Sequence, residues 1–201
     1  MKRYALPLLF TTLALTACQT SSLTQEEKAP VEPTEASFSR EMKEIDKSQS
    51  AISFQGNSNI IDHEGKFPVY DTEVTLDATE PANLEKAKIT AEVDLTATEV
   101  DAPVLQGHLQ KADFFDVENH PKATFVSTSI VSKGDNMYTV TGDLMIKGVT
   151  KSITFDAEIT DAYLTAAFEV ARQDFGIGND SYGQKLLELM VPVQVKMVFM
   201  K

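Results

Sequence analysis

The chain of 201 residues contains a single cysteine, Cys18, and so cannot form an internal disulfide framework. If Cys18 is modified during maturation, the remaining chain has no thiol, which excludes cysteine nucleophiles and thiolate metal sites. Basic residues are also scarce, since 18 lysines and arginines stand against 30 acids, for a net charge of −12. This charge argues against nucleic acid as a partner. It also argues against electrostatic adsorption to anionic lipid, which needs basic clusters.

Local signatures of catalysis are lacking as well. The three histidines, His63, His108 and His120, match neither HExxH nor any other zinc-site spacing. The sequence has no G-x-S-x-G nucleophile elbow and no glycine-rich phosphate loop. Paired carboxylates for glycoside chemistry stay open, because that pairing is spatial. We therefore predict that the protein is not an enzyme and holds no metal or cofactor.

The only long apolar run extends from Tyr4 to Ala17 and follows the basic pair Lys2 and Arg3. It is too short to cross a bilayer and ends in small residues, which is the layout of a signal peptide. Its end, Leu-Thr-Ala-Cys18, resembles a bacterial lipoprotein cleavage box, in which the cysteine becomes the lipidated N-terminus. The alternative is ordinary secretory cleavage near Ala17, which leaves Cys18 as a free thiol.

The lipoprotein interpretation predicts a signal peptide at residues 1–17 and acyl chains, palmitate among them, on Cys18. Stable membrane attachment would then rest on more than one acyl chain. Gln19, which is not aspartate, implies export to the outer membrane of a bacterial envelope, facing the periplasm. Residues 18–45 are rich in Ser, Thr, Glu and Pro, and we expect a flexible tether.

From residue 46 to 201 the sequence changes to a period of two, which is typical of strands with one buried face. The strands are expected at 52–54, 70–76, 87–95, 123–131, 138–146, 153–159, 162–170 and 191–199. No helical pattern alternates with them, so we predict an all-β fold. An antiparallel sheet of about eight strands with one apolar face must close into a barrel or fold double. The long connection between Leu95 and Ala123 predicts a short helix or loop at the mouth.

The barrel interior is either packed or hollow. Its predicted inward rows alternate large side chains with alanines, namely Ala87, Ala91, Ala123, Ala157, Ala162 and Ala166. These alanines either leave a lumen or interdigitate with large residues from the opposite wall. Periodicity alone leaves both interpretations open.

Two blocks of sequence resemble the YceI family of bacterial periplasmic lipid-binding proteins. They are HLQKADFFDVENHPKATFVSTSI, which begins at His108, and YTVTGDLMIKGVTKSITF, which begins at Tyr138. The family pattern runs close to H-L-x-S-x-D-F-F-D-x-x-x-x-P-x-x-x-F-x-S, followed by tGdLtihGvTk. Further matches are Gly65-Lys-Phe67 and Arg172-Gln-Asp-Phe-Gly176, so the resemblance covers the chain from about Ile45 to its end.

The resemblance implies an antiparallel, eight-stranded, lipocalin-like barrel whose apolar lumen binds a long isoprenoid chain, such as a polyprenyl lipid or a quinone. The residues expected to bind this ligand are Phe67, Tyr70, Ile89, His108, Leu109, Phe114, Phe115, Phe125, Arg172 and Phe175. The alternative for each phenylalanine is plain core packing. For His108 it is a buried hydrogen bond, and for Arg172 a structural ion pair.

The sequence departs from the family pattern at Leu105 and Gln106, where relatives carry arginine and aspartate, and at Met145 and Lys147. Loss of the polar partners at positions 105 and 106 affects either the head-group end of the ligand or a structural hydrogen bond, and we expect the alkyl-binding lumen to be retained. Three function classes follow: a lipid carrier, a structural envelope lipoprotein with a packed barrel, and an enzyme acting on a lumen-bound lipid. A homodimer stays open.

Overall fold

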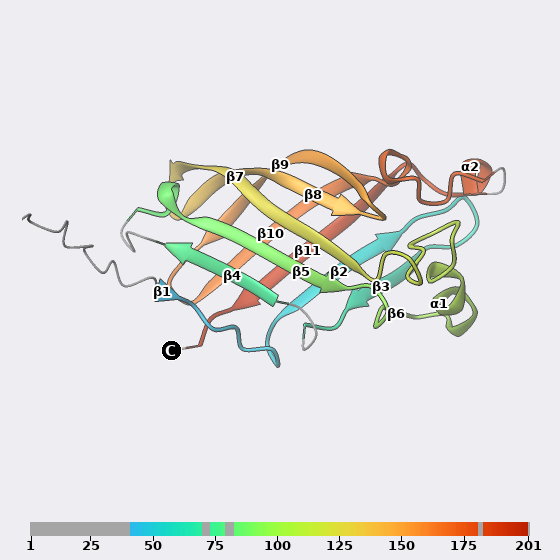
Figure 1. Ribbon diagram of the computed structural model, residues 1–201, viewed down its shortest axis with the longest axis horizontal. Helices are drawn as coiled ribbons and strands as arrows, with labels where there is room; N and C mark the ends of the chain where they lie inside the picture. Colours follow the sequence, from blue (N-terminus) through green and yellow to red (C-terminus); the bar gives the residue numbers. More distant parts are fainter. Residues whose placement is uncertain (1–40, 70–72, 79–82, 181–182, 201) are drawn as a thin grey trace, which may run out of the picture. The chain divides into compact units, whose positions relative to one another are not determined.

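The computed structural model describes residues 41–69, 73–78, 83–180 and 183–200. In this part of the chain one antiparallel sheet of eleven strands curls around an apolar interior (Figure 1). The strands that alternation predicted are all present, as β2 (Ala51–Gly56), β4 (Glu73–Ala78), β5 (Lys88–Asp94), β7 (Lys122–Gly134), β8 (Met137–Ile146), β9 (Val149–Ile159), β10 (Tyr163–Ala171) and β11 (Met190–Val198). The predicted all-β antiparallel fold is therefore confirmed.

Three further strands raise the count above the predicted eight. They are β1 (Glu41–Met42), β3 (His63–Phe67) and β6 (Glu99–Val100). All three are short, and β3 reads HEGKF, in which apolar and polar residues do not alternate. A period-two pattern needs more residues than these strands have, so the sequence could not reveal them.

The N-terminal segment joins the two sides of the curled sheet. Glu41–Met42 pair with β4, and Ile45 forms an antiparallel bridge with Phe199, just beyond β11. Backbone hydrogen bonds extend this bridge, from Met200 N to Glu44 O and from Asp46 N to Val198 O, both at 2.8 Å. Where residues 41–46 meet both β4 and the end of β11, they close a ring with β4, β5, β7, β8, β9, β10 and β11. The strands β3 and β6 extend the sheet from β2.

The sheet begins earlier in the chain than the predicted boundary between the tether and the barrel. We expected the tether to end at residue 45 and the barrel to begin at residue 46, but residues 41–45 already belong to the sheet. Their pattern is too short to be recognised as a strand. The predicted signal peptide, Cys18 and the remainder of the tether lie outside the described residues.

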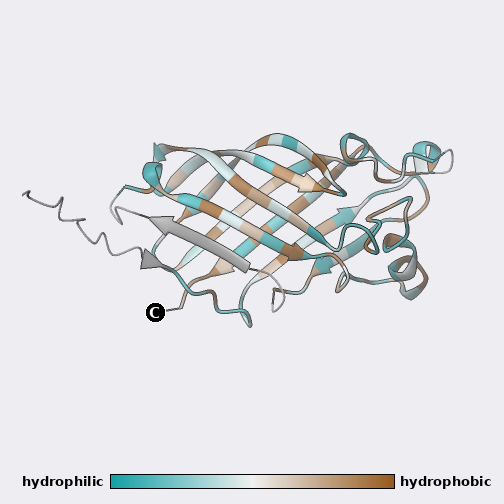
Figure 2. Cartoon of the chain, in the orientation of Figure 1, coloured by the Kyte–Doolittle hydropathy of each residue, from teal (hydrophilic) through white to brown (hydrophobic). Residues whose placement is uncertain are grey.

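Figure 2 shows hydrophilic and hydrophobic residues in bands along the strands, and the burial of the side chains follows this alternation. On β9, for example, Ala157 and Ile159 are buried, whereas Thr154 and Asp156 are exposed. Ala162 departs from the prediction, because it is exposed in the turn between β9 and β10 rather than inside the barrel. The other predicted inward alanines lie in or against the core or the cavity described below.

Tight hairpins set the register of the long central strands. Asp135 and Asn136 have φ of 52° and 63° between β7 and β8, and Lys147 and Gly148 have φ of 52° and 72° between β8 and β9. Two consecutive residues with positive φ match the twist of paired strands. Gly148 also packs against His120, whose Cε1 would lie 3.0 Å from an added Cβ.

Helical segments gather at one end of the barrel, which we call the helical end (Figure 1). They are α1 (Pro103–Leu109), the 3-10 helix η3 (Arg172–Phe175) and α2 (Gly183–Leu186); a further 3-10 helix, η2 (Leu84–Lys86), lies in the β4–β5 connection. The predicted helix or loop at the mouth is present as α1 and a turn-rich loop over residues 110–121. No described helix has the length and apolar character needed to cross a membrane.

Candidate functional site

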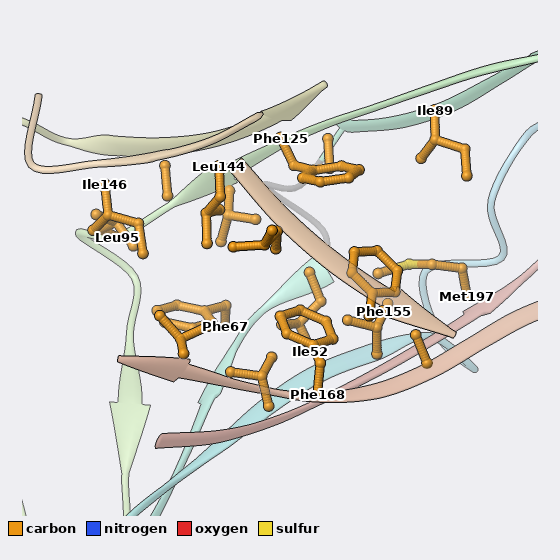
Figure 3. Close-up of a pocket in the computed structure, with 18 of the residues that line it drawn as sticks. Ile52, Phe67, Ile89, Leu95, Phe125, Leu144, Ile146, Phe155, Phe168 and Met197 are labelled. Carbon is orange, nitrogen blue, oxygen red and sulfur yellow. The ribbon is translucent and has the colours of Figure 1, made fainter. Parts of the chain in front are cut away.

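The interior of the barrel contains a cavity of about 160 Å³. Its walls come from β2, β3, β5, β7, β8, β9, β10 and β11, together with the loop that carries Phe115. The described residues that line it are Ile52, Phe67, Ile89, Ala91, Val93, Leu95, Phe115, Ala123, Phe125, Leu144, Ile146, Ile153, Phe155, Leu164, Ala166, Phe168, Val170, Val193, Val195 and Met197. Every one of them is apolar, and Figure 3 shows the side chains of 18 of them around a shared space.

Aromatic rings form one wall of the cavity. The ring centroids of Phe125 and Phe155 are 5.6 Å apart, and those of Phe155 and Phe168 are 4.6 Å apart with nearly parallel planes. Phe125 lies over Gly142, where an added Cβ would come within 2.4 Å of the ring and 2.6 Å of the Val126 carbonyl oxygen. The glycine therefore makes room for this ring on the neighbouring strand.

At the helical end the cavity is covered by a group of buried side chains, which we call the helical-end core. Its members are Leu95, Leu109, Phe115, Ala123, Val170, Phe175 and Ile177. Phe115 reaches from the loop into the cavity and contacts Phe67 and Phe54 at centroid distances of 6.0 and 6.5 Å. Several of these residues lie on helices and loops, so this end is closed by side-chain packing rather than by a continuous strand ladder.

A few identifiable hydrogen bonds hold the loop over residues 110–121 in place. Phe115 N donates to Leu109 O at 3.0 Å, and Gly178 N donates to Asp113 O at 2.7 Å. Lys147 Nζ, from the β8–β9 turn, donates to Ala112 O at 2.6 Å and to Gly176 O at 3.1 Å. Lys147 thereby ties the loop, the β8–β9 hairpin and the η3 region together.

Arg172 is buried in the helical end, where it organises the chain between η3 and β11. Its guanidinium donates to five carbonyl oxygens, those of Ile177, Gly178, Gly183, Leu187 and Glu188, at 2.7 to 3.0 Å. Burial lowers the pKa of Arg172, while the charge of Asp180 acts in the opposite direction. Its observed contacts are thus with backbone carbonyls, which corrects the expected alternative of a structural ion pair.

His108 lies on α1 and is exposed, so the expectation that its hydrogen bond is buried is wrong. The expected carboxylate partner is present. Its Nε2 lies 2.9 Å from Asp113 Oδ2, and its ring contacts Phe114 at a centroid distance of 5.0 Å. Burial acts to raise the pKa of Asp113, but hydrogen bonding, chiefly to His108, leaves that pKa below its ordinary value. The pair therefore braces the loop after α1.

The structure divides the predicted binding residues into four groups. Phe67, Ile89, Phe115 and Phe125 line the cavity. Leu109, Phe114 and Phe175 belong to the helical-end core or pack against it. His108 and Arg172 make the polar contacts given above, and Tyr70 lies outside the described residues. The lining residues that were not singled out, such as Phe155, Phe168 and Val193, occupy inward positions of alternating strands, so the pattern itself was the signal that could have found them.

In the described ranges no three His, Cys, Asp or Glu side chains come together in a way that could hold a metal ion. The arrangement of the cavity offers apolar contact and shape, which are the means of holding a hydrocarbon.

The sequence matches a family model described as a YceI-like domain over residues 44–199. A UPF0312 protein of Pseudomonas putida is 32% identical over 140 residues, which cover 65% of this chain and 71% of the relative. A UPF0312 protein of Vibrio parahaemolyticus is 32% identical over 119 residues, covering 59% of this chain and 53% of the relative.

Solved structures share the fold. Burkholderia cenocepacia BcnA superposes with a TM-score of 0.70 at 23% identity, covering 77% of this chain and 99% of BcnA. A polyisoprenoid binding domain from Saccharophagus degradans gives a TM-score of 0.55 at 12% identity, covering 79% of this chain and 96% of that domain. The family match extends over most of the chain and confirms the predicted resemblance. The protein is a member of the YceI-like domain family.

Proposed function

We propose that the protein binds a long isoprenoid chain, such as a polyprenyl lipid or a quinone, and sequesters or carries it. The observation that supports this proposal is the lining of the cavity, in which every described residue is apolar. Such a wall favours a hydrocarbon, because each buried CH₂ contributes about 0.8 kcal/mol without any polar contact. The polyisoprenoid binding domain of the same fold adds support.

The volume of the cavity bears on how such a chain fits. At about 160 Å³ it compares with engineered cavities of roughly 150 Å³ that take up benzene. A long isoprenoid therefore needs more room than this state provides. We expect the helical-end core to supply it, because side-chain contacts there can shift without breaking a strand ladder.

Mass spectrometry of the protein purified from its own host tests the proposal. We expect a bound isoprenoid in the native spectrum and in organic extracts, and uptake of added polyprenol or quinone by ligand-free protein. If the protein co-purifies with no lipid in several preparations and takes up neither polyprenol nor quinone, the result would instead support a structural lipoprotein with a packed barrel.

We further propose that the protein is anchored by acyl chains on Cys18 and faces the periplasm from the outer membrane. The support is sequence alone: the apolar run from Tyr4 to Ala17, the cleavage box and the following Gln19. Metabolic labelling with palmitate should mark the protein, and Cys18→Ala should abolish the label and move the protein from the membrane fraction to the soluble periplasmic fraction. An unlabelled protein would favour ordinary secretion.

A further inference from the structure

Exposed aliphatic side chains gather at the helical end. They are Ile60 and Ile61 in the β2–β3 connection, Val104 on α1, and Leu189 and Met190 where β11 begins; we call this group the apolar rim. Val104 is 90% exposed and Ile60 is 72% exposed, although aliphatic side chains of this size are usually at least partly buried. Grouped apolar residues on a surface mark a site of contact with another apolar surface.

Hydrogen bonds place the parts of the apolar rim next to one another. Ser58 forms a β-bridge with Leu187, and Glu188 N donates to Asn57 O at 3.0 Å, so the β2–β3 connection runs beside the start of β11. His63 Nδ1 lies 2.8 Å from Asp101 Oδ1, which joins the end of the same connection to the start of α1. Figure 1 shows the β2–β3 connection, α1 and α2 at this one end of the barrel.

We propose that the apolar rim docks the helical end on a bilayer of zwitterionic lipid, where the cavity exchanges its ligand. This proposal rests on the proposed function, because a carrier of an isoprenoid must collect it from a membrane or deliver it there. The rim lies at the end at which the cavity is closed by the helical-end core instead of by strands. Docking and access to the cavity thus fall on the same end of the molecule.

The charges beside the rim favour a zwitterionic surface over two other apolar partners. Acidic side chains outnumber basic ones there, with Asp62, Glu64, Asp101 and Glu188 against Lys66, Lys111 and Lys185. An anionic bilayer would meet like charge, and so would a second copy of the chain that docked through the same rim. A zwitterionic surface accepts the aliphatic side chains without that repulsion.

The length of chain that precedes the sheet is compatible with docking on the membrane that would hold Cys18. The chain joins the sheet at β1, at the end of the barrel away from α1 (Figure 1). Residues 19–40 can span about 75 Å when fully extended. The longest strand, β7, has 13 residues, which corresponds to about 44 Å. The tether can therefore reach past the barrel.

Vesicle flotation of the mature chain, without the predicted signal peptide of residues 1–17 and with Cys18→Ser, tests the proposal in the absence of any N-terminal membrane anchor. The probe is a vesicle of phosphatidylcholine, compared with vesicles that contain one quarter phosphatidylglycerol. The variant Ile60→Ser with Ile61→Ser should bind phosphatidylcholine vesicles at least about tenfold more weakly, since two exposed aliphatic side chains are removed. Val131→Ser is the matched control, because Val131 is 51% exposed but lies on β7 near the opposite end.

We expect the parent chain and the Val131→Ser control to float with phosphatidylcholine, and phosphatidylglycerol to weaken that binding. Absence of flotation by the parent chain, or equal flotation of both variants, would overturn the docking proposal. A rim-dependent dimer in light scattering without flotation would overturn it in favour of a second copy as the partner.

Uptake of polyprenol delivered from ethanol, with no vesicles present, is measured on the same preparations. Uptake without flotation would overturn docking and leave the proposed function standing. Flotation without uptake would support docking and count against isoprenoid binding, so the two failures are distinguishable.

Discussion

Arg172 satisfies a set of backbone carbonyls that nothing smaller can reach at once. Its five hydrogen bonds need the planar guanidinium, whereas lysine has three donors on one nitrogen. We predict that Arg172→Lys lowers the free energy of unfolding by about 3 kcal/mol, because buried carbonyls lose their donors. Urea unfolding measures the change.

Lys185→Met is the control for Arg172→Lys, since Lys185 is an exposed cation in the same region. It should alter the free energy of unfolding by less than about 0.5 kcal/mol. Equal effects of the two substitutions would show that the carbonyl contacts of Arg172 contribute little.

Ala166 offers a direct test of the cavity, because it lines the wall while its neighbour Ala167 is exposed on the other face of β10. We predict that Ala166→Phe fills the cavity and weakens binding of added polyprenol by about tenfold or more. Ala167→Phe should leave binding unchanged. Fluorescence titration with a labelled isoprenoid measures both, and equal affinities would place the ligand elsewhere.

Between elements, Ser127 links β5 and β7 where their regular pairing stops. The pairing of β5 with β7 ends at Thr90 and Val126, and Ser127 adjoins an irregularity in the β7–β8 ladder. Its hydroxyl oxygen accepts a hydrogen bond from Ile89 N at 2.8 Å in a buried position. The side chain thus takes the place of a carbonyl acceptor.

We predict that Ser127→Ala lowers the free energy of unfolding by about 1–2 kcal/mol, because the Ile89 N–H is left buried and unsatisfied. Ser129→Ala changes the same residue type on the same strand at an exposed position and should have little effect. Thermal unfolding compares the two variants. A larger loss for Ser129→Ala would contradict the role given to Ser127.

The long strands were predictable from the sequence, because a strand with one solvent-exposed face and one buried face has alternating polar and apolar residues. Most of the cavity wall follows from the same alternation, as Ile89 and Phe125 illustrate, whereas Phe67 lies on β3 and was predictable only from the family resemblance. Short β3 and β6 carry no such pattern and owe their pairing to tertiary contacts. The carbonyl contacts of Arg172 and the loop contacts of Lys147 join residues whose proximity only the folded chain creates, so their roles could not be predicted.

Across the whole domain, hydrogen-bonded aspartates connect stability to pH. Hydrogen bonds from Ser48 and Gln49 lower the pKa of Asp46, one with His63 lowers the pKa of Asp101, and those from Lys133 and Thr139 lower the pKa of Asp156. A carboxyl whose pKa is lower in the folded state stabilises the fold above its unfolded pKa of about 3.9. That contribution is lost as the pH falls through the folded pKa.

We therefore predict that acid unfolding occurs below about pH 4, with each such aspartate contributing modestly because it is exposed. Asp156→Asn isolates one contribution: the parent chain should have the higher Tm at pH 6, and the difference should disappear near pH 2. Calorimetry across this range measures it. A difference that grows on acidification would have the wrong sign for a lowered pKa.

The N-terminal segment that closes the ring must pair with the C-terminal region before folding is complete. Ser50 and Val198, hydrogen-bonded through the serine hydroxyl, are 148 positions apart in the chain, and the bridge between Ile45 and Phe199 joins the same two regions. Contacts of such high sequence separation slow folding, because a long loop must close before they form. In a chain synthesised from its N-terminus, β2 has no β11 partner until the last residues arrive. Loss of only the final few residues would thus leave every cavity side chain in place and still remove the step that completes the barrel.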